Sequence, residues 1–156
     1  VLLGDDMMRS DSTVLADIGS YLTQLGNTPP LITVALLMIV LGFAFKVSAV
    51  PFHFWAPDTY EGAPTPVAAF LSVASTTAGF VALMQILYVG FLSNNNVWGP
   101  LCWVLAALSM TVGNLIALRQ TNIVRMLAYS SVAQAGYILV PFAVAGANGH
   151  ALVTAQ

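Results

Sequence analysis

The sequence has very little charge, and this scarcity excludes most soluble folds. Only 6% of its 156 residues are charged, four Lys or Arg and six Asp or Glu, whereas a soluble domain averages about 25%. A water-facing surface cannot be built from so few charges. Four basic residues also make no electrostatic footprint for a nucleic acid, so none is an expected partner. At 58% hydrophobic, the chain is too apolar to stay disordered.

Cysteine and cofactor motifs are equally scarce. The single cysteine, Cys102, excludes a disulfide scaffold and cannot hold an iron–sulfur cluster. The sequence contains neither a G-x-G-x-x-G motif nor a P-loop, so it predicts no nucleotide site. We therefore expect no cofactor and no metal ion to be bound by this chain itself.

The sequence does have long apolar runs, which predict an all-α integral membrane protein. A spanning helix needs about 20 apolar residues, and four stretches qualify. The predicted spans are residues 31–55, 67–92, 98–118 and 126–147. They predict a polytopic helical bundle over residues 31–156, because helices satisfy their own backbone hydrogen bonds in lipid.

Residues 1–30 differ from the rest because they hold five of the charges. Apolar residues from Val14 to Leu25 recur at helical spacing, with Asp17 and Gln24 on the opposite face. This pattern predicts an external amphipathic segment that lies on the membrane surface or packs on neighbouring helices. Since the chain begins and ends near apolar segments, we expect a part of a longer protein, truncated at both ends.

The basic residues predict the orientation in the membrane. Arg119 and Arg125 flank the connection between the third and fourth spans, and basic loops favour the cytoplasmic side. Alternation of the spans then places residues 57–66 on the same side. Their composition predicts a turn-rich loop, in which Asp58 and Glu61 are solvated or paired with a neighbouring subunit.

Lys46 is the only charged residue within a predicted span. A lysine near the bilayer centre costs roughly 2.5–3.5 kcal/mol on insertion scales, and such residues usually face the bundle interior and mark an ion path. A desolvated lysine can exchange a proton near neutral pH. The alternative is a lysine whose amine reaches the inner membrane surface.

Pro51 and His53 follow Lys46 within the first predicted span. Pro51 cannot donate a hydrogen bond to the carbonyl of Val47, so we expect the span to be broken near Pro51, as in ion transporters, or simply kinked. On a straight helix His53 would share a face with Lys46, at a distance that one or two waters can bridge. His53 is a candidate proton relay, or an interfacial histidine bonded to a loop carbonyl.

Two groups of polar side chains on other spans predict a path for protons. They are Ser72, Ser75 and Thr76 in the second span and Ser130, Gln134 and Tyr137 in the fourth. Pro141 follows the second group and predicts a second helix break. Each group can hold water along a path, or can hydrogen-bond between helices.

Two segments resemble a known family. Residues 42–67 read GFAFKVSAVPFHFWAPDTYEGAPTPV, and residues 120–137 read QTNIVRMLAYSSVAQAGY. Both resemble the antiporter-like, proton-conducting membrane subunits of respiratory complex I, the NADH–quinone oxidoreductases. The first segment is most similar to the subunit N branch, and the resemblance covers nearly all of residues 31–145.

The resemblance implies a fourteen-helix fold with two inverted repeats, each with a broken helix. This chain would be its middle, and the first span would be the broken helix of the first repeat. The resemblance also implies that Lys46 is the central proton carrier. Thr76 stands where the family usually has a second lysine, and a threonine can support a water wire but cannot hold a charge. The acidic partner of Lys46 and a distal lysine would lie outside this chain.

The resemblance further implies a proton-translocating subunit of an enzyme complex, coupled to electron transfer elsewhere. NADH, flavin, iron–sulfur clusters and quinone would then belong to other subunits, and the partners would be other membrane subunits, the lipid bilayer, protons and water. The expected location is a bacterial or archaeal plasma membrane, or an organellar inner or thylakoid membrane. Two alternatives stay open: a subunit of a multisubunit cation/proton antiporter, and a structural membrane subunit that has lost pumping.

Overall fold

The computed structural model describes residues 15–25 and 30–153, and within these ranges all regular structure is helical. Residues 1–14 and 26–29 of the predicted external segment lie outside the described residues. The helices are α2 (Leu15–Leu25), α3 (Pro30–Lys46), α4 (Trp55–Gly62), α5 (Thr65–Phe70), η1 (Leu71–Ser75), α6 (Thr76–Gln85), η2 (Ile86–Gly90), η3 (Leu92–Asn94), α7 (Asn95–Ala117) and α8 (Ile123–Val153). The π-helical turns η1 and η2 belong to one continuous helix with α5 and α6.

The helices confirm the predicted all-α membrane fold. Three are long and apolar enough to cross a membrane, namely Thr65–Gly90, Leu92–Ala117 and Ile123–Val144. The fourth, α3, is apolar but shorter. Large apolar side chains on these helices stay exposed, such as Met38, Phe70 and Leu115, as suits contact with lipid or with further helices.

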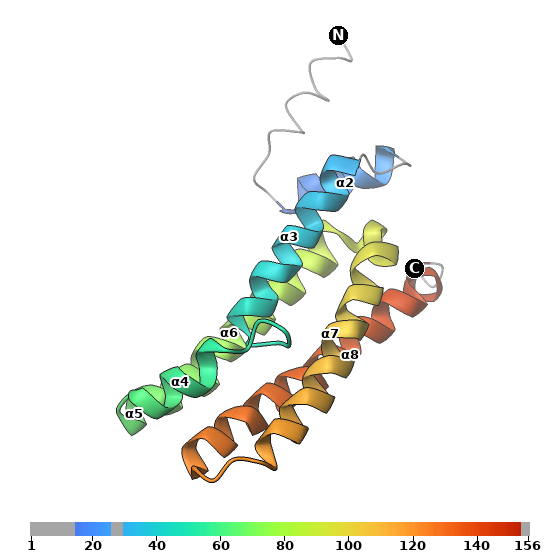
Figure 1. Ribbon diagram of the computed structural model, residues 1–156. Helices are drawn as coiled ribbons and strands as arrows, with labels where there is room; N and C mark the ends of the chain where they lie inside the picture. Colours follow the sequence, from blue (N-terminus) through green and yellow to red (C-terminus); the bar gives the residue numbers. More distant parts are fainter. Residues whose placement is uncertain (1–14, 26–29, 154–156) are drawn as a thin grey trace.

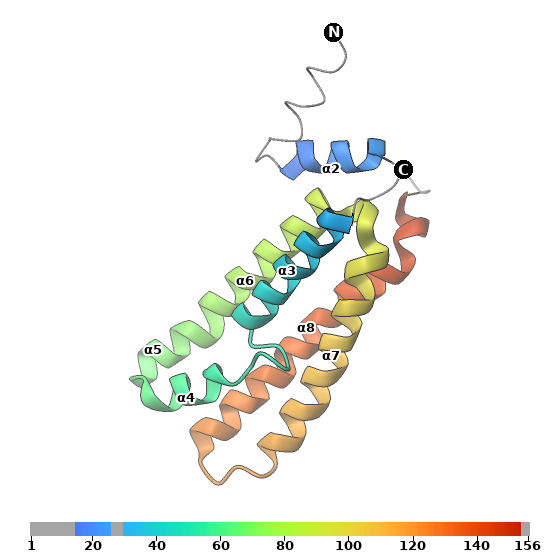
Figure 2. The ribbon, with the colours of Figure 1, turned by 45° about the horizontal axis from the view of Figure 1, so that its top comes forward.

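The apolar helices alternate in direction (Figure 1). In both views α3 lies beside α6, and α7 and α8 form an antiparallel hairpin. The short helix α2 lies across one end of the bundle (Figure 2), against η2 and η3. At the opposite end, α4 lies near the turn between α7 and α8. As predicted, the segment that carries Asp58 and Glu61 therefore shares one end with the basic turn.

Helix α2 packs on the bundle through its apolar face. Leu22 is buried, and Ile18 packs against the core. Gly19 allows a close approach, because a Cβ at this position would lie 2.6 Å from the carbonyl oxygen of Val89. Packing on neighbouring helices was one of the two placements that the sequence predicted for this segment.

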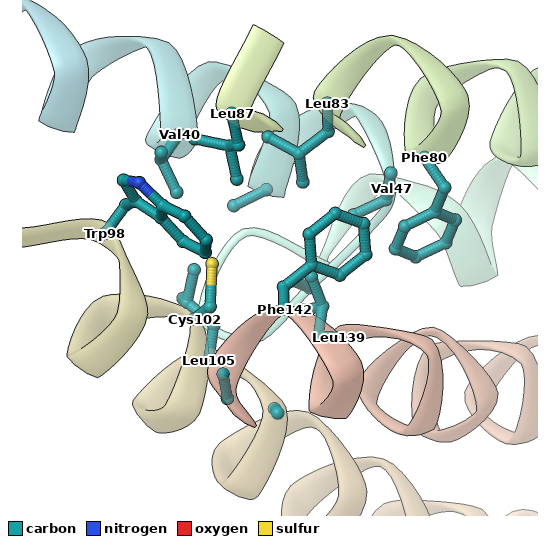
Figure 3. Close-up of a cluster of buried hydrophobic side chains, with 14 of the residues drawn as sticks. Val40, Val47, Phe80, Leu83, Leu87, Trp98, Cys102, Leu105, Leu139 and Phe142 are labelled. Carbon is teal, nitrogen blue, oxygen red and sulfur yellow. The ribbon is translucent and has the colours of Figure 1, made fainter. Parts of the chain in front are cut away.

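The core lies where α3, α6, α7 and α8 meet (Figure 3). Trp98 of α7 is fully buried in it, and its Nε1 donates a hydrogen bond of 3.0 Å to the carbonyl of Phe91. The other fully buried core side chains include Leu36, Val40, Val47, Leu83, Leu87, Cys102 and Leu139. Most come from the long helices, so the apolar runs supply both the core and the exposed surface.

The first predicted span is not one helix. Helix α3 ends at Lys46, and residues 47–54 are non-helical before α4 begins at Trp55. The predicted extent of 31–55 is therefore wrong, whereas the predicted break near Pro51 is confirmed. The Val50–Pro51 peptide bond is cis. Helical geometry is disfavoured at the residue before a proline, here Val50. The segment around it therefore stays non-helical.

Helix α3 ends in a Schellman motif. The Ala49 N–H donates to the Ala44 carbonyl at 2.8 Å, and the Ser48 N–H donates to the Phe45 carbonyl at 3.1 Å. Ser48 has a φ of 59°, the left-handed conformation that glycine usually supplies at this position. The helix therefore stops before the proline, and a serine occupies the turn.

Side chains of other elements satisfy the open backbone of the break. The buried Ser109 Oγ, on α7, accepts a hydrogen bond of 2.8 Å from the Val50 N–H. Trp55 Nε1 donates to the Phe45 carbonyl at 2.9 Å. Non-helical backbone at membrane depth is stable only with such protein partners, so these contacts fix the break.

Two further predictions about prolines are wrong. Residues 57–66 are not a loop, because α4 and the start of α5 cover most of them. Pro57 and Pro66 lie in the first turns of those helices, where a missing N–H costs nothing. The break predicted at Pro141 does not occur, since α8 continues through this residue. Its buried neighbours Leu139 and Phe142 pack in the core and hold the helix together.

Candidate proton-transfer site

Lys46 and Ser75 form the centre of the site. Lys46 is the last residue of α3, and its Nζ donates a hydrogen bond of 2.8 Å to Ser75 Oγ on η1. Gly79 lets the two helices approach, because a Cβ there would lie 3.3 Å from Lys46 Cγ. The free carbonyls at a helix C-terminus favour a cation. Within the described ranges, no carboxylate forms an ion pair with Lys46.

The Lys46 side chain is exposed in the described chain, whereas the sequence predicted it to face the bundle interior. It lines a groove of about 410 Å³ beside apolar residues of α2, α3 and η2, among them Leu15, Phe43 and Ile86. The Lys46 amine therefore lies at the border of these helices. Ser75 contacts it on one side, and its other side is exposed.

A cavity of about 150 Å³ lies between the break after α3, α4, the η1–α6 junction and α8. We name it the polar cavity because half of its lining residues carry hydrogen-bonding side chains, although apolar side chains complete the lining. Its hydrogen-bonding lining side chains are Ser48, Tyr60, Ser72, Thr76, Thr77, Ser131 and Gln134. Of the predicted path residues, it brings together Ser72, Thr76 and Gln134. None of its lining residues is charged. A polar cavity of this size has room for several waters.

Other predicted residues lie elsewhere. Ser75 contacts Lys46 and does not line the cavity. Ser130 and Tyr137 do not line it either, because α8 presents Ser131 and Gln134 to it instead. Of the three polar residues predicted on one face of α8, only Gln134 therefore lines the cavity.

His53 lies in the break and is 3% exposed. It does not share a helix face with Lys46, because α3 ends at Lys46 and the straight helix that such a face requires does not form. Its ring lies 4.6 Å from the ring of Phe54 and 6.0 Å from that of Tyr129, between centroids. Its Nδ1 has no hydrogen-bond partner in the part of the chain that the structure describes.

Tyr60 was missed from the sequence. It is buried on α4, lines the cavity and packs with Ala56 and Ala128. Burial raises the pKa of its hydroxyl, and a hydrogen bond with Thr76 acts in the opposite direction. The helical spacing of Ala56 and Tyr60 was the available signal, but the prolines around them led to the prediction of a loop.

An ionic cluster lies at the α4 end of the site. Arg125 Nη1 contacts Asp58 Oδ1 and Glu61 Oε2, each at 2.7 Å. Asn122 Nδ2 donates to the other Glu61 oxygen, also at 2.7 Å. Asp58 and Glu61 are thus paired within this chain and not with a neighbouring subunit, and the Asp58 side chain also stays largely solvated, at 72% exposed. The cluster ties α4 to the start of α8.

We expect Glu61→Gln to lower the melting temperature more than Asp58→Asn. Glu61 has two side-chain partners, whereas Asp58 has one and its side chain is 72% exposed. Thermal unfolding of the complete subunit in detergent measures the difference. Because the Debye length falls to about 3 Å at 1 M salt, high salt should reduce the difference between the two melting temperatures. Equal melting temperatures at low salt would contradict the unequal roles.

The arrangement can hold and pass protons. It combines one titratable amine at a broken helix end, a hydroxyl bonded to it, and a neutral polar cavity on the neighbouring turn. No group of three His, Cys, Asp or Glu side chains that could hold a metal ion occurs in the described ranges.

The chain belongs to a family of membrane proteins that share this helical framework. Residues 7–156 match the family model described as "NADH:quinone oxidoreductase/Mrp antiporter, TM". This match covers almost the whole chain and fits both the apolar helices and the broken one.

Within the family, the chain is similar to members of the subunit N branch that the sequence motifs indicated. It is 50% identical over 139 residues to NADH-quinone oxidoreductase subunit N of Trichlorobacter lovleyi, which covers 88% of this chain and 28% of that protein. It is 57% identical over 114 residues to subunit N of Rubrobacter xylanophilus, covering 73% of this chain and 24% of that protein.

A solved structure shares the fold. A chain of respiratory complex I from Thermus thermophilus with bound aureothin matches with a TM-score of 0.65 and 40% identity. The match covers 74% of this chain and 25% of that chain. This chain therefore spans about a quarter of the length of its relatives, and the predicted resemblance to the complex I membrane subunits is confirmed.

Proposed function

We propose that this chain is the central part of a proton-translocating membrane subunit of a complex I-type NADH–quinone oxidoreductase. Lys46 holds and releases the transported proton. The observation that carries the proposal is the 2.8 Å hydrogen bond from Lys46 Nζ to Ser75 Oγ at the broken end of α3. The names of the relatives support the class of complex.

A hydroxyl is a suitable neighbour for a lysine that changes its protonation state. Ser75 Oγ accepts a hydrogen bond from the ammonium, and the same hydroxyl can donate to the neutral amine after the proton has left. A carboxylate in this place would favour the charged amine. Ser75 can therefore serve both the charged and the neutral form of the Lys46 amine.

The exposed side of Lys46 is where the rest of the subunit would lie. The groove beside it is lined by apolar residues of α2, α3 and η2, a surface that further membrane helices can cover. We propose that those helices bury Lys46 and bring a carboxylate toward it. His53 is the candidate relay within the break.

The redox chemistry belongs to other subunits in this proposal. NADH, flavin, iron–sulfur clusters and quinone are bound outside this chain, which couples their electron transfer to proton movement. Its partners are the neighbouring membrane subunits, lipid, water and protons. Its location is the plasma membrane of a bacterium or archaeon, or the corresponding organellar membrane.

A cation/proton antiporter subunit is the second candidate, because the family description includes Mrp antiporters. The relatives described above are quinone oxidoreductase subunits, and they favour the first candidate. A structural subunit without pumping is the third, and Thr76 supports it, because this hydroxyl cannot hold a charge at the η1–α6 junction.

The experiment is proton uptake by vesicles that contain the complete complex with the complete subunit. We expect NADH oxidation by quinone to drive proton uptake without sodium, and omission of the subunit to lower the number of protons moved per electron. Proton movement that requires a sodium gradient and no NADH would instead establish the antiporter. An unchanged ratio without the subunit would establish a structural role.

A further inference from the structure

The Phe45 carbonyl, directly before Lys46 in α3, accepts two hydrogen bonds. The Ser48 N–H donates to it at 3.1 Å, and Trp55 Nε1 donates to it at 2.9 Å. A backbone carbonyl oxygen has two lone pairs, so these two donors occupy both. The carbonyl that precedes Lys46 therefore has no acceptor capacity left.

This occupancy matters because the end of a helix attracts a lysine. The last carbonyls of a helix carry the negative end of its dipole, and a lysine side chain nearby can donate to them. The two carbonyls before that of Phe45 also accept from the break, in hydrogen bonds of 2.8 Å from the N–H groups of Val47 and Ala49. The Lys46 amine donates instead to Ser75, on another helix.

Among the donors to these three carbonyls, the indole of Trp55 is the one side chain. Trp55 is the first residue of α4, so its hydrogen bond crosses the break from one helix to the other. Its ring lies 5.9 Å from the Phe45 ring and 6.4 Å from the Tyr60 ring, between centroids. Aromatic contacts with both helices therefore hold the indole N–H in place.

The surroundings of the Lys46 amine contain no competing charge in the part of the chain that the structure describes. None of the residues that line the groove with Lys46 is charged or titratable. The charged or titratable side chains of α2, the break and α4 do not line this groove, namely Asp17, His53, Asp58, Tyr60 and Glu61. The contacts of the amine are therefore decided by Ser75 and by the end of α3.

We propose that Trp55 is a positioning residue for proton transfer at Lys46, because its indole N–H occupies an acceptor that would otherwise compete with Ser75 for the amine. This inference rests on the proposed function and adds a residue to it. Without the indole N–H, one lone pair of the Phe45 carbonyl is free, and the ammonium form of Lys46 can donate to it. Because a helix C-terminus favours a cation, the charged form gains more than the neutral form, and the proton leaves more slowly.

The test is NADH-driven proton uptake by vesicles with the complete complex carrying Trp55→Phe. This variant removes the N–H and keeps an aromatic ring beside Phe45. At neutral pH we expect the rate of uptake per assembled complex to fall about twofold to fivefold, the size of a contact between a cation and a helix end. The deficit should shrink as the pH on both sides of the membrane is raised, because a higher pH favours release from the ammonium. A wild-type rate at every pH would overturn the role of Trp55.

Two control variants separate this role from a weakened break. Ser109→Ala removes the acceptor of the Val50 N–H but leaves the donors to the Phe45 carbonyl in place, so its deficit should be the same at every pH. Trp103→Phe makes the same exchange at a tryptophan that is 64% exposed on α7, and it should keep the wild-type rate. A deficit in Trp55→Phe that does not change with pH, or an equal deficit in Trp103→Phe, would overturn the proposal.

A tryptophan analogue removes the N–H with little change of shape. Benzothienylalanine at position 55 has a sulfur atom in place of the indole N–H and fills nearly the same space. It should show the same pH-dependent deficit, and it decides the question if Trp55→Phe fails to assemble. A wild-type rate with this analogue would show that the hydrogen bond to the Phe45 carbonyl has no role in proton transfer.

Lys46→Met in the same vesicles distinguishes a failure of this proposal from a failure of the proposed function. A lysine variant without uptake, beside wild-type rates for Trp55→Phe and the analogue, would overturn the role of Trp55 and leave the proposed function standing. Wild-type uptake in Lys46→Met would overturn the proposed function itself.

Discussion

Replacement of Lys46 by methionine is expected to reduce NADH-driven proton uptake to less than about a tenth of the wild-type rate. Methionine fills similar space along the apolar stem but holds no proton and cannot donate to Ser75, which lies 2.8 Å from Nζ. Uptake by vesicles with the complete complex, normalised to assembled complex, measures the effect. The helices should remain intact, because the side chain is exposed at the end of α3.

Two control variants separate a mobile proton from a fixed charge. Lys46→Arg keeps the positive charge, but a guanidinium does not release its proton in proteins, so it should be as inactive as Lys46→Met. Arg119→Met removes a positive charge from the exposed turn after α7 and should leave uptake unchanged. Wild-type uptake with Lys46→Arg would show that only a fixed charge is needed, and Lys46 would not be the carrier.

The long helices could be predicted from the sequence because lipid imposes a length and a composition. The apolar runs predicted spans at 67–92 and 126–147, close to the observed Thr65–Gly90 and Ile123–Val144. The break after Lys46 was harder to place, because the partners of its open backbone are distant in sequence. Ser109 lies 59 residues from Val50, and no local pattern predicts that contact.

The site was predictable where it depends on residue type and unpredictable where it depends on packing. A lone lysine in an apolar run drew attention to Lys46, and the polar group of the second span included Ser75. The sequence did not pair these two residues, which are 29 positions apart. Tyr60 was missed because the prolines of residues 57–66 are typical of turns. In the structure they begin helices instead. The pairing of Arg125 with Asp58 needs the fold as well, since α4 and α8 are far apart in the sequence.

Replacement of Gly136 by alanine is expected to lower the free energy of unfolding by about 1–3 kcal/mol, the usual cost of overpacking. A Cβ at this position would lie 2.9 Å from the Met110 backbone nitrogen and 2.9 Å from Ser109 Cβ. Because one of these atoms is backbone, α7 and α8 must move apart. Thermal unfolding of the complete subunit in detergent measures the loss.

Gly42→Ala is the matched control, because it makes the same change within α3. Apart from the neighbouring residues and the backbone of α3 itself, no atom of the described residues lies within 4 Å of the added Cβ. Alanine is favoured over glycine inside a helix by roughly 0.5–1 kcal/mol. The melting temperature should therefore rise, opposite in sign to the effect of Gly136→Ala. Equal effects would contradict the close α7–α8 contact.

The consequence of Gly136→Ala should extend to proton transfer. The displaced Ser109 accepts the hydrogen bond that fixes Val50 in the break, and Gln134 and Ala135 line the polar cavity just before Gly136 in α8. Separation of α7 from α8 therefore disturbs the broken helix and the cavity together. We expect uptake per assembled complex to fall in Gly136→Ala. A destabilised Gly136→Ala variant with full uptake would show that the cavity tolerates this shift.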